Sequence, residues 1–165
     1  MDSPTPTAGV IKDGEHLLPI RVYYEDTDFT GLVYHANYLR YFERGRSDFL
    51  RLAGVDHRML LERPDPAAFA ITRIAVEYKR AARVDDALLV RTTYDAVKGP
   101  RLLISQRIFR EGDPHLLALI VTGLANSALR WFQPRRPLTP EGAGELLADL
   151  AVASIAAMNV RQTGD

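Results

Sequence analysis

The sequence predicts an α+β fold in which one long helix lies against a strongly curved, five-stranded antiparallel sheet. Two observations indicate this class. One strand, one helix and then four further strands follow one another along the chain, and the links between the later strands are short, as at residues 84–86 and 98–100. Short links favour antiparallel neighbours, because parallel strands require longer crossover connections. Burying one face of the sheet under the helix gives a two-layer domain.

The predicted first strand passes through Ile20, where apolar and polar side chains alternate. Ile20, Val22 and Tyr24 fall on one face, so we expect Tyr24 to point inward. Residues 1–16 mix Pro, Thr, Ser, Gly and Asp without periodicity, which is typical of a mobile tail.

A change in hydrophobic period marks the helix. Between residues 36 and 53 apolar side chains recur at steps of three and four. Gly45 lies on this apolar stripe at a cost of ~1 kcal/mol in helix propensity, so we expect a close approach of the helix to the sheet. Gly54 is placed to end the helix as a C-cap, and residues 55–67 form a proline-containing connection.

Four strand-like runs follow the connection. They lie at about residues 69–80, 86–97, 101–110 and 115–129. In the first run the apolar phase slips near Thr72 and Arg73, which predicts a β-bulge. The last run is apolar on both faces, as is typical of a central strand.

The chain is long enough for one domain with a buried core and too short for two ordinary enzyme domains. Thr139 and Pro140 fit the N-cap and first position of a terminal helix. We therefore expect a tail at residues 1–16, one domain at residues 17–138, and a C-terminal helix and tail at residues 139–165.

Composition restricts the functions to be considered. With 47% apolar and 25% charged residues, and 21 basic against 21 acidic side chains, the chain has the profile of a soluble globular protein, without the basic excess that nucleic-acid partners favour. It contains no cysteine, which excludes disulfides, thiolate nucleophiles and cysteine metal sites. We see no membrane span and no signal peptide, and expect a cytoplasmic protein.

Residues 23–38 contain the chemistry that we single out, because a strand end, an acidic turn, a glycine and a helix start follow one another there. A calcium loop fits Asp26, Asp28 and Gly31 but places Asn37 where a bidentate Glu is needed. The same stretch matches the DxDxT pattern of haloacid dehalogenase-type phosphatases. That motif ends a buried parallel strand, whereas this strand alternates and hairpins follow, so both alternatives are disfavoured.

A third interpretation uses the longer context. The segment RVYYEDTDFTGLVYHANYLRYFE at residues 21–43, together with EYKRAARVDD at residues 77–86, closely resembles the hotdog-fold acyl-CoA thioesterases, specifically the 4-hydroxybenzoyl-CoA thioesterase-like group that includes tol-pal-associated enzymes. The resemblance covers about residues 17–140 and agrees with the element order above. It departs from the family at Phe29 and Thr30, where smaller residues are common.

The resemblance implies hydrolysis of an acyl-CoA thioester. It assigns Asp28 as general base or nucleophile, the peptide N–H of His35 as oxyanion donor, and the His35 and Tyr24 side chains as helpers. Asp28 and His35 are seven positions apart, as in these thioesterases, whereas hotdog hydratases carry Asp and His five apart. Asp26 is interpreted as an organiser of the turn.

The same resemblance implies partners. Lys79, Arg80 and Arg83 are candidates for contact with the CoA phosphates, with an ordinary solvated strand edge as the alternative. CoA is part of the substrate, so we expect no separate cofactor and no metal. Acyl carrier protein is a possible donor, and exposed sheet edges favour a homodimer or homotetramer. The competing function is an acyl-CoA or acyl-carrier binding protein of envelope lipid metabolism with little hydrolysis.

Overall fold

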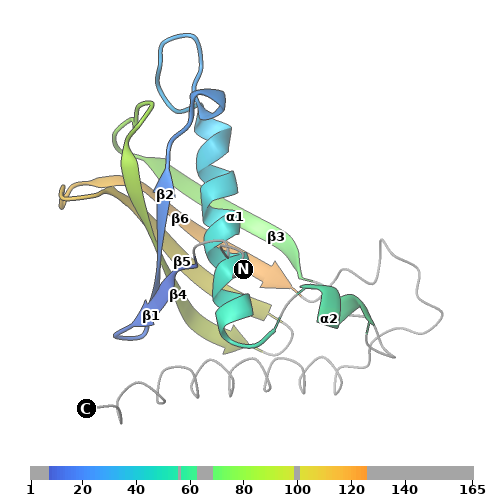
Figure 1. Ribbon diagram of the computed structural model, residues 1–165. Coiled ribbons are helices and arrows are strands. Elements are labelled where there is room, and N and C mark those ends of the chain that lie inside the picture. Colours follow the sequence, from blue (N-terminus) through green and yellow to red (C-terminus); the bar gives the residue numbers. More distant parts are fainter. Residues whose placement is uncertain (1–7, 56, 63–68, 99–100, 126–165) are drawn as a thin grey trace, which may run out of the picture.

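The computed structural model describes residues 8–55, 57–62, 69–98 and 101–125. The elements in chain order are β1 (Val10–Lys12), β2 (Glu15–Arg21), the short 3-10 helix η1 (Tyr24–Asp26), α1 (His35–Leu52), α2 (His57–Glu62), β3 (Ala70–Tyr78), β4 (Ala87–Lys98), β5 (Arg101–Arg110) and β6 (Leu116–Ala125). The strands form one antiparallel sheet in the order β1-β2-β4-β5-β6-β3, and α1 lies against one face of it (Figure 1). The predicted α+β class is confirmed.

The sheet has six strands among the described residues, where the sequence predicted five. The additional strand, β1, pairs with β2 through a two-residue turn at Asp13 and Gly14, whose φ angles are 50° and 77°. Two successive positive φ values match the hairpin turn that Asp-Gly pairs favour. The prediction of a tail over residues 1–16 is therefore wrong for residues 10–16, and residues 1–7 lie outside the described part.

Helix α1 approaches the sheet as closely as Gly45 suggested. A Cβ atom on Gly45 would lie 2.9 Å from Thr92 Oγ1 and 3.0 Å from Gln106 Nε2, so no larger residue fits without movement. Tyr41 and Phe42 are fully buried between the helix and the sheet. Gly54, at φ 82°, ends the helix as predicted. The connection that follows contains α2, which the sequence did not predict.

Two strand predictions are confirmed. The register of β3 against β6 shifts between Ile71 and Arg73, at the expected bulge. Strand β6 lies between β5 and β3, as a strand apolar on both faces requires, although the predicted residues 126–129 lie outside the described part. The predicted terminal helix and tail at residues 139–165 also lie outside it. Among the helices of the described residues, none has the length and apolar character that crossing a membrane requires.

Candidate active site

The acidic segment forms a closed loop in front of α1. Thr27 and Val33 form an antiparallel bridge. Inside it, the Asp28 N–H donates to the Leu32 carbonyl at 2.9 Å, and the Gly31 N–H donates to the Asp28 carbonyl at 3.0 Å. Gly31 has φ 74°, a left-handed conformation that glycine adopts without steric cost. The backbone alone therefore fixes the position of Asp28.

Asp26 connects this loop to the helix, which confirms its predicted structural role. Its side chain is 5% exposed and accepts the Tyr23 N–H at 2.9 Å. Its carbonyl accepts the Tyr34 N–H at 3.0 Å and the Asn37 side-chain amide at 2.8 Å. Because Asn37 is buried in the first turn of α1, these bonds hold the loop at a fixed distance from the helix start.

The Asp28 carboxylate is exposed and bonded to Thr30. One oxygen accepts the Thr30 N–H at 2.8 Å and the Thr30 hydroxyl at 2.5 Å. The hydroxyl bond, then the backbone bond, lowers the pKa of Asp28 below its ordinary value. Asp28 is thus an ionised carboxylate at neutral pH. The sequence analysis did not predict that Thr30 would hold the Asp28 carboxylate.

His35 is the first residue of α1, one position before the predicted start of the helix at residue 36. The N-cap residue Tyr34 makes no side-chain cap, and the His35 peptide N–H has no hydrogen-bond partner in the described chain. Free N–H groups at a helix start favour negative charge. The imidazole is exposed and lies against the Tyr34 ring, with 4.3 Å between centroids.

Tyr78 joins strand β3 to this helix start, a contact that sequence reasoning missed. Its hydroxyl donates to the His35 carbonyl at 3.0 Å, and its ring is nearly perpendicular to the imidazole at 6.3 Å. Tyr78 is part of the segment that carried the family resemblance, which was the available signal. The contact fixes the edge strand next to the free N–H groups.

The expected inward orientation of Tyr24 is wrong. Tyr24 is 87% exposed and lies in η1, because β2 ends at Arg21 and the alternation of faces stops with the strand. Val22 is the last residue to follow it, at 0% exposure. The Tyr24 hydroxyl forms no hydrogen bond within the described residues.

The segments at residues 21–43 and 77–86, on which the family resemblance rests, lie side by side. The Val33 N–H donates to the Ala82 carbonyl at 2.9 Å, and the Ala82 N–H donates to the buried Tyr38 hydroxyl at 2.8 Å. Leu32 and Arg83 also form a β-bridge. These contacts bring residues 79–83, which include the predicted phosphate ligands, next to the loop that contains Asp28.

The three predicted phosphate ligands, Lys79, Arg80 and Arg83, are all exposed. Lys79 pairs with Glu77 at 2.5 Å, whereas the guanidinium groups of Arg80 and Arg83 form no ion pair within the part of the chain described. Arg83 is also tied to the loop through its backbone. The two arginines are therefore better placed than the lysine to meet an anionic ligand beside Asp28.

A groove lies along α1 and begins at Leu39, about one helical turn after His35. The helix packs most closely over β1, β2 and β4, whereas Tyr78 of the edge strand β3 contacts the first turn of the helix. The space between α1 and β3 contains a cavity of about 510 Å³. Its lining combines four apolar with four charged side chains, and consists of Leu39, Arg40, Glu43, Arg44, Arg46, Ile71, Ile74 and Ile120. Apolar concave surfaces of this size are typical of small-molecule sites.

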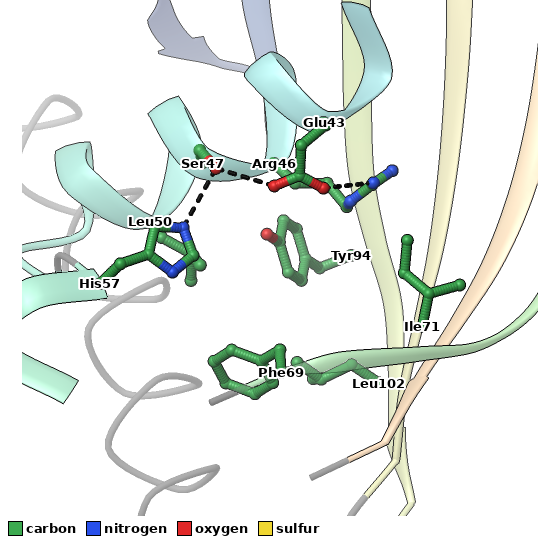
Figure 2. A pocket seen from close by; sticks show the side chains of 9 residues that line it. All are labelled: Glu43, Arg46, Ser47, Leu50, His57, Phe69, Ile71, Tyr94 and Leu102. Carbon is green, nitrogen blue, oxygen red and sulfur yellow. Dashed lines mark hydrogen bonds and ion pairs between the residues drawn. The ribbon is translucent and has the colours of Figure 1, made fainter. Parts of the chain in front are cut away.

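A second cavity, of about 390 Å³, adjoins the first and shares Glu43, Arg46 and Ile71 with it. We call it the far pocket. Figure 2 shows its polar side, on α1 and α2, and its apolar side, on the sheet. The lining comprises Glu43, Arg46, Ser47, Leu50, His57, Phe69, Ile71, Tyr94 and Leu102. The sequence did not predict this pocket, because its walls come from five separate segments.

Within the described residues, no group of three or more His, Cys, Asp or Glu side chains is arranged to hold a metal ion. The site's chemical groups are one ionised carboxylate, free peptide N–H groups at a helix start, two unpaired arginines and an apolar groove. This set suits addition to a carbonyl followed by departure of a stable leaving group.

Comparison with known proteins identifies the family. A family model described as the thioesterase-like superfamily matches residues 22–146. The chain belongs to this superfamily. The match includes the acidic loop, α1 and the strands from β3 onward, and it confirms the resemblance and the hotdog fold expected from the sequence.

Individual relatives of this thioesterase agree. Acyl-CoA thioesterase YbgC of Haemophilus influenzae is 45% identical over 98 residues, which are 59% of this chain and 71% of that protein. The acyl-CoA thioester hydrolase YbgC of Escherichia coli is 41% identical over 90 residues, or 54% of this chain and 66% of that protein. A solved probable thioesterase from Bartonella henselae aligns with a TM-score of 0.65 at 33% identity, covering 69% of this chain and 94% of that one. The chain is a thioester hydrolase, as predicted.

Proposed function

We propose that this thioesterase hydrolyses acyl-CoA thioesters to the free acid and CoA, with Asp28 as general base or direct nucleophile. The observation that carries the proposal is the ionised Asp28 carboxylate, fixed by backbone bonds in front of the uncapped start of α1. Thioester hydrolysis needs a base or nucleophile on one side of the carbonyl and charge stabilisation on the other. The names of the YbgC relatives support acyl-CoA as the substrate.

The oxyanion donor in this proposal is the His35 peptide N–H. A hydrogen-bond donor that points at the developing negative charge lowers the activation barrier most when the donor has no other acceptor. The helix N-terminus adds a favourable partial positive charge. The leaving thiolate, with a thiol pKa of ~8.5, needs less protonation than an alkoxide, so a single carboxylate suffices. The His35 imidazole and the exposed Tyr24 hydroxyl stay predictions as helpers.

The CoA portion is proposed to lie over Arg80 and Arg83, with the acyl chain in the groove between α1 and β3. Strand β3 is one of the two edge strands of the sheet among the described residues, and both of its faces are largely exposed, including Ile71, Ile74 and Tyr78. Pairing this edge with that of a second chain would cover it and enclose the groove. A homodimer or homotetramer, acyl carrier protein as an alternative donor, and a cytoplasmic location stay predictions.

The test is thiol release from a panel of acyl-CoA thioesters by the wild type, Asp28→Asn and Asp13→Asn proteins. We expect Asp28→Asn to lower kcat by roughly 10²- to 10⁴-fold, the range of general base catalysis. Asp13→Asn is the matched control, since Asp13 lies in the β1–β2 turn and Asn tolerates its positive φ. Equal activity of wild type and Asp28→Asn would overturn the catalytic assignment. Binding of acyl-CoA with no turnover would favour the carrier function.

A further inference from the structure

The groove between α1 and β3 continues well beyond the reacting carbonyl. A helix rises about 1.5 Å per residue, so Glu43 and Ser47 lie roughly 12 Å and 18 Å along α1 from His35. Glu43 and Arg46 line both cavities, which therefore lie next to each other along α1. A single aromatic ring bound at His35 would stop short of the far pocket. An extended alkyl chain advances roughly 1.3 Å per carbon with bonds of about 1.5 Å, so about twelve carbons reach it.

One wall of the far pocket is polar, and the methyl group at the end of a simple acyl chain could form no hydrogen bond with it. Glu43 pairs with Arg46 at 2.5 Å and accepts the Ser47 hydroxyl at 2.9 Å. That hydroxyl lies 3.1 Å from His57 Nε2. Arg46 is 5% exposed, and its guanidinium also donates to Gln106 at 2.7 Å. Since a guanidinium carries five N–H donors, these two bonds leave donors available.

Tyr94 supplies the decisive group. Its ring is stacked on Phe49 at 4.2 Å, which fixes its orientation beneath the Glu43–Arg46 pair (Figure 2). Its hydroxyl is buried and has no hydrogen-bond partner among the described residues. Burial raises the pKa of Tyr94, so the hydroxyl keeps its proton. A buried hydroxyl without a partner is unfavourable, and a ligand that bonds to it removes that penalty.

We propose that the far pocket binds a neutral hydroxyl at the remote end of a long acyl chain, so that the preferred substrates are long-chain hydroxyacyl thioesters. This rests on the proposed acyl-CoA hydrolysis. A hydroxyl can accept from Tyr94 or Arg46 and donate to Glu43, whereas a methyl end leaves Tyr94 unpartnered. A remote carboxylate is disfavoured, because Glu43 already neutralises Arg46 and would repel a second negative charge.

The experiment compares dodecanoyl-CoA, 12-hydroxydodecanoyl-CoA and the CoA monothioester of dodecanedioic acid. For the wild type we expect kcat/KM to be about ten-fold higher for the hydroxyacyl substrate than for dodecanoyl-CoA, as one gained hydrogen bond would give. The dicarboxylic thioester should be the poorest of the three. Tyr94→Phe should bring the hydroxyacyl to dodecanoyl ratio close to one.

Two further variants make the comparison specific. Ser105→Ala is the control for loss of a hydroxyl, because Ser105 bonds Asp95 on the opposite face of β5, and its ratio should equal that of the wild type. Glu43→Gln should raise kcat/KM for the dicarboxylic thioester relative to dodecanoyl-CoA. A hydroxyacyl preference that is absent, or that survives in Tyr94→Phe, would overturn the proposal.

Binding measurements distinguish the far-pocket proposal from the proposed hydrolysis of acyl-CoA. Dissociation constants for the three thioesters, measured by calorimetry with the Asp28→Asn protein, should follow the same order without turnover. If the wild type hydrolyses dodecanoyl-CoA but neither measurement favours the hydroxyacyl thioester, the hydrolase assignment stands and the far-pocket proposal falls. If no thioester is hydrolysed but the binding order holds, the pocket proposal stands and the hydrolase assignment falls.

Discussion

The loop before α1 and the far pocket differ in how their polar groups are held. Asp28 is positioned by backbone bonds and by Thr30, all within five residues of it, and its carboxylate faces solvent. The far pocket brings together Tyr94, Arg46 and His57 from three elements, and the Tyr94 hydroxyl has no hydrogen-bond partner in the described part of the chain. Local bonds fix a reactive group, whereas long-range packing shapes a binding surface. We therefore assign the chemistry to the loop and the selectivity to the pocket.

The Asp28 loop and the far pocket both depend on the close packing of α1 on the sheet. A substitution that moves the helix away from the sheet should therefore impair both. Gly45→Val places methyl groups where a Cβ alone would lie 2.9 Å from Thr92 Oγ1, and overpacking of this kind costs about 1–3 kcal/mol or more. We expect a lower Tm and reduced kcat/KM for every thioester. Thermal unfolding and steady-state kinetics measure the two effects.

Gly54→Ala is the matched control for this change. Gly54 has φ 82° but nothing within 4 Å of its missing Cβ, so the substitution introduces backbone strain without a clash. We expect a loss of about 1 kcal/mol in unfolding free energy, the cost of a non-glycine residue in this conformation, with the substrate preference kept. Equal Tm values for Gly45→Val and wild type would contradict the close contact.

Substitutions of Thr30 test the role of the Asp28 loop separately from that of the far pocket. The proposed mechanism requires ionised Asp28, and the Thr30 bonds lower the pKa of Asp28. Thr30→Val removes the hydroxyl bond, so the pKa rises and the acidic limb of the kcat/KM profile moves to higher pH. Thr30→Ser keeps the hydroxyl and should keep the wild-type limb. A profile measured between pH 3 and 8 tests this, and an unshifted limb in Thr30→Val would exclude Asp28 as the titrating base.

The smallest effect is expected at the mouth of the site. Arg83→Ala should raise KM for an acyl-CoA by roughly two- to five-fold, as exposed ion pairs contribute about 0.2–1 kcal/mol, with kcat unchanged. The effect should weaken at high salt and vanish for an acyl-pantetheine, which lacks the nucleotide phosphates. Arg58→Ala on α2, where Arg58 pairs with Glu62, is the control. The same increase in KM with acyl-pantetheine would show that Arg83 does not contact phosphate.

The features that sequence reasoning found are those with local causes. The turn at Asp26, the close approach at Gly45 and the bulge near Arg73 each follow from residue type and period within a few positions. The hairpin at Asp13 and Gly14 had an equally local signal, which was overlooked in a segment interpreted as a tail.

The errors and omissions have non-local causes. The alternation that placed Tyr24 inward assumed that the strand continues, but β2 ends where its pairing with β4 ends, at Arg21 opposite Ala87. The far pocket depends on how Tyr94 and Phe69, 25 positions apart, are brought together by strand order and register. The hydrophobic periodicity of neither segment predicts that these two residues line the same pocket.

The division between chemistry and selectivity is tested most directly by one set of kinetic constants. These are kcat/KM for dodecanoyl-CoA and 12-hydroxydodecanoyl-CoA, measured for wild type, Asp28→Asn and Tyr94→Phe. Asp28→Asn should lower both values by the same large factor and keep their ratio, whereas Tyr94→Phe should lower the ratio about ten-fold. A change of ratio in Asp28→Asn, or an equal loss on both substrates in Tyr94→Phe, would contradict the account.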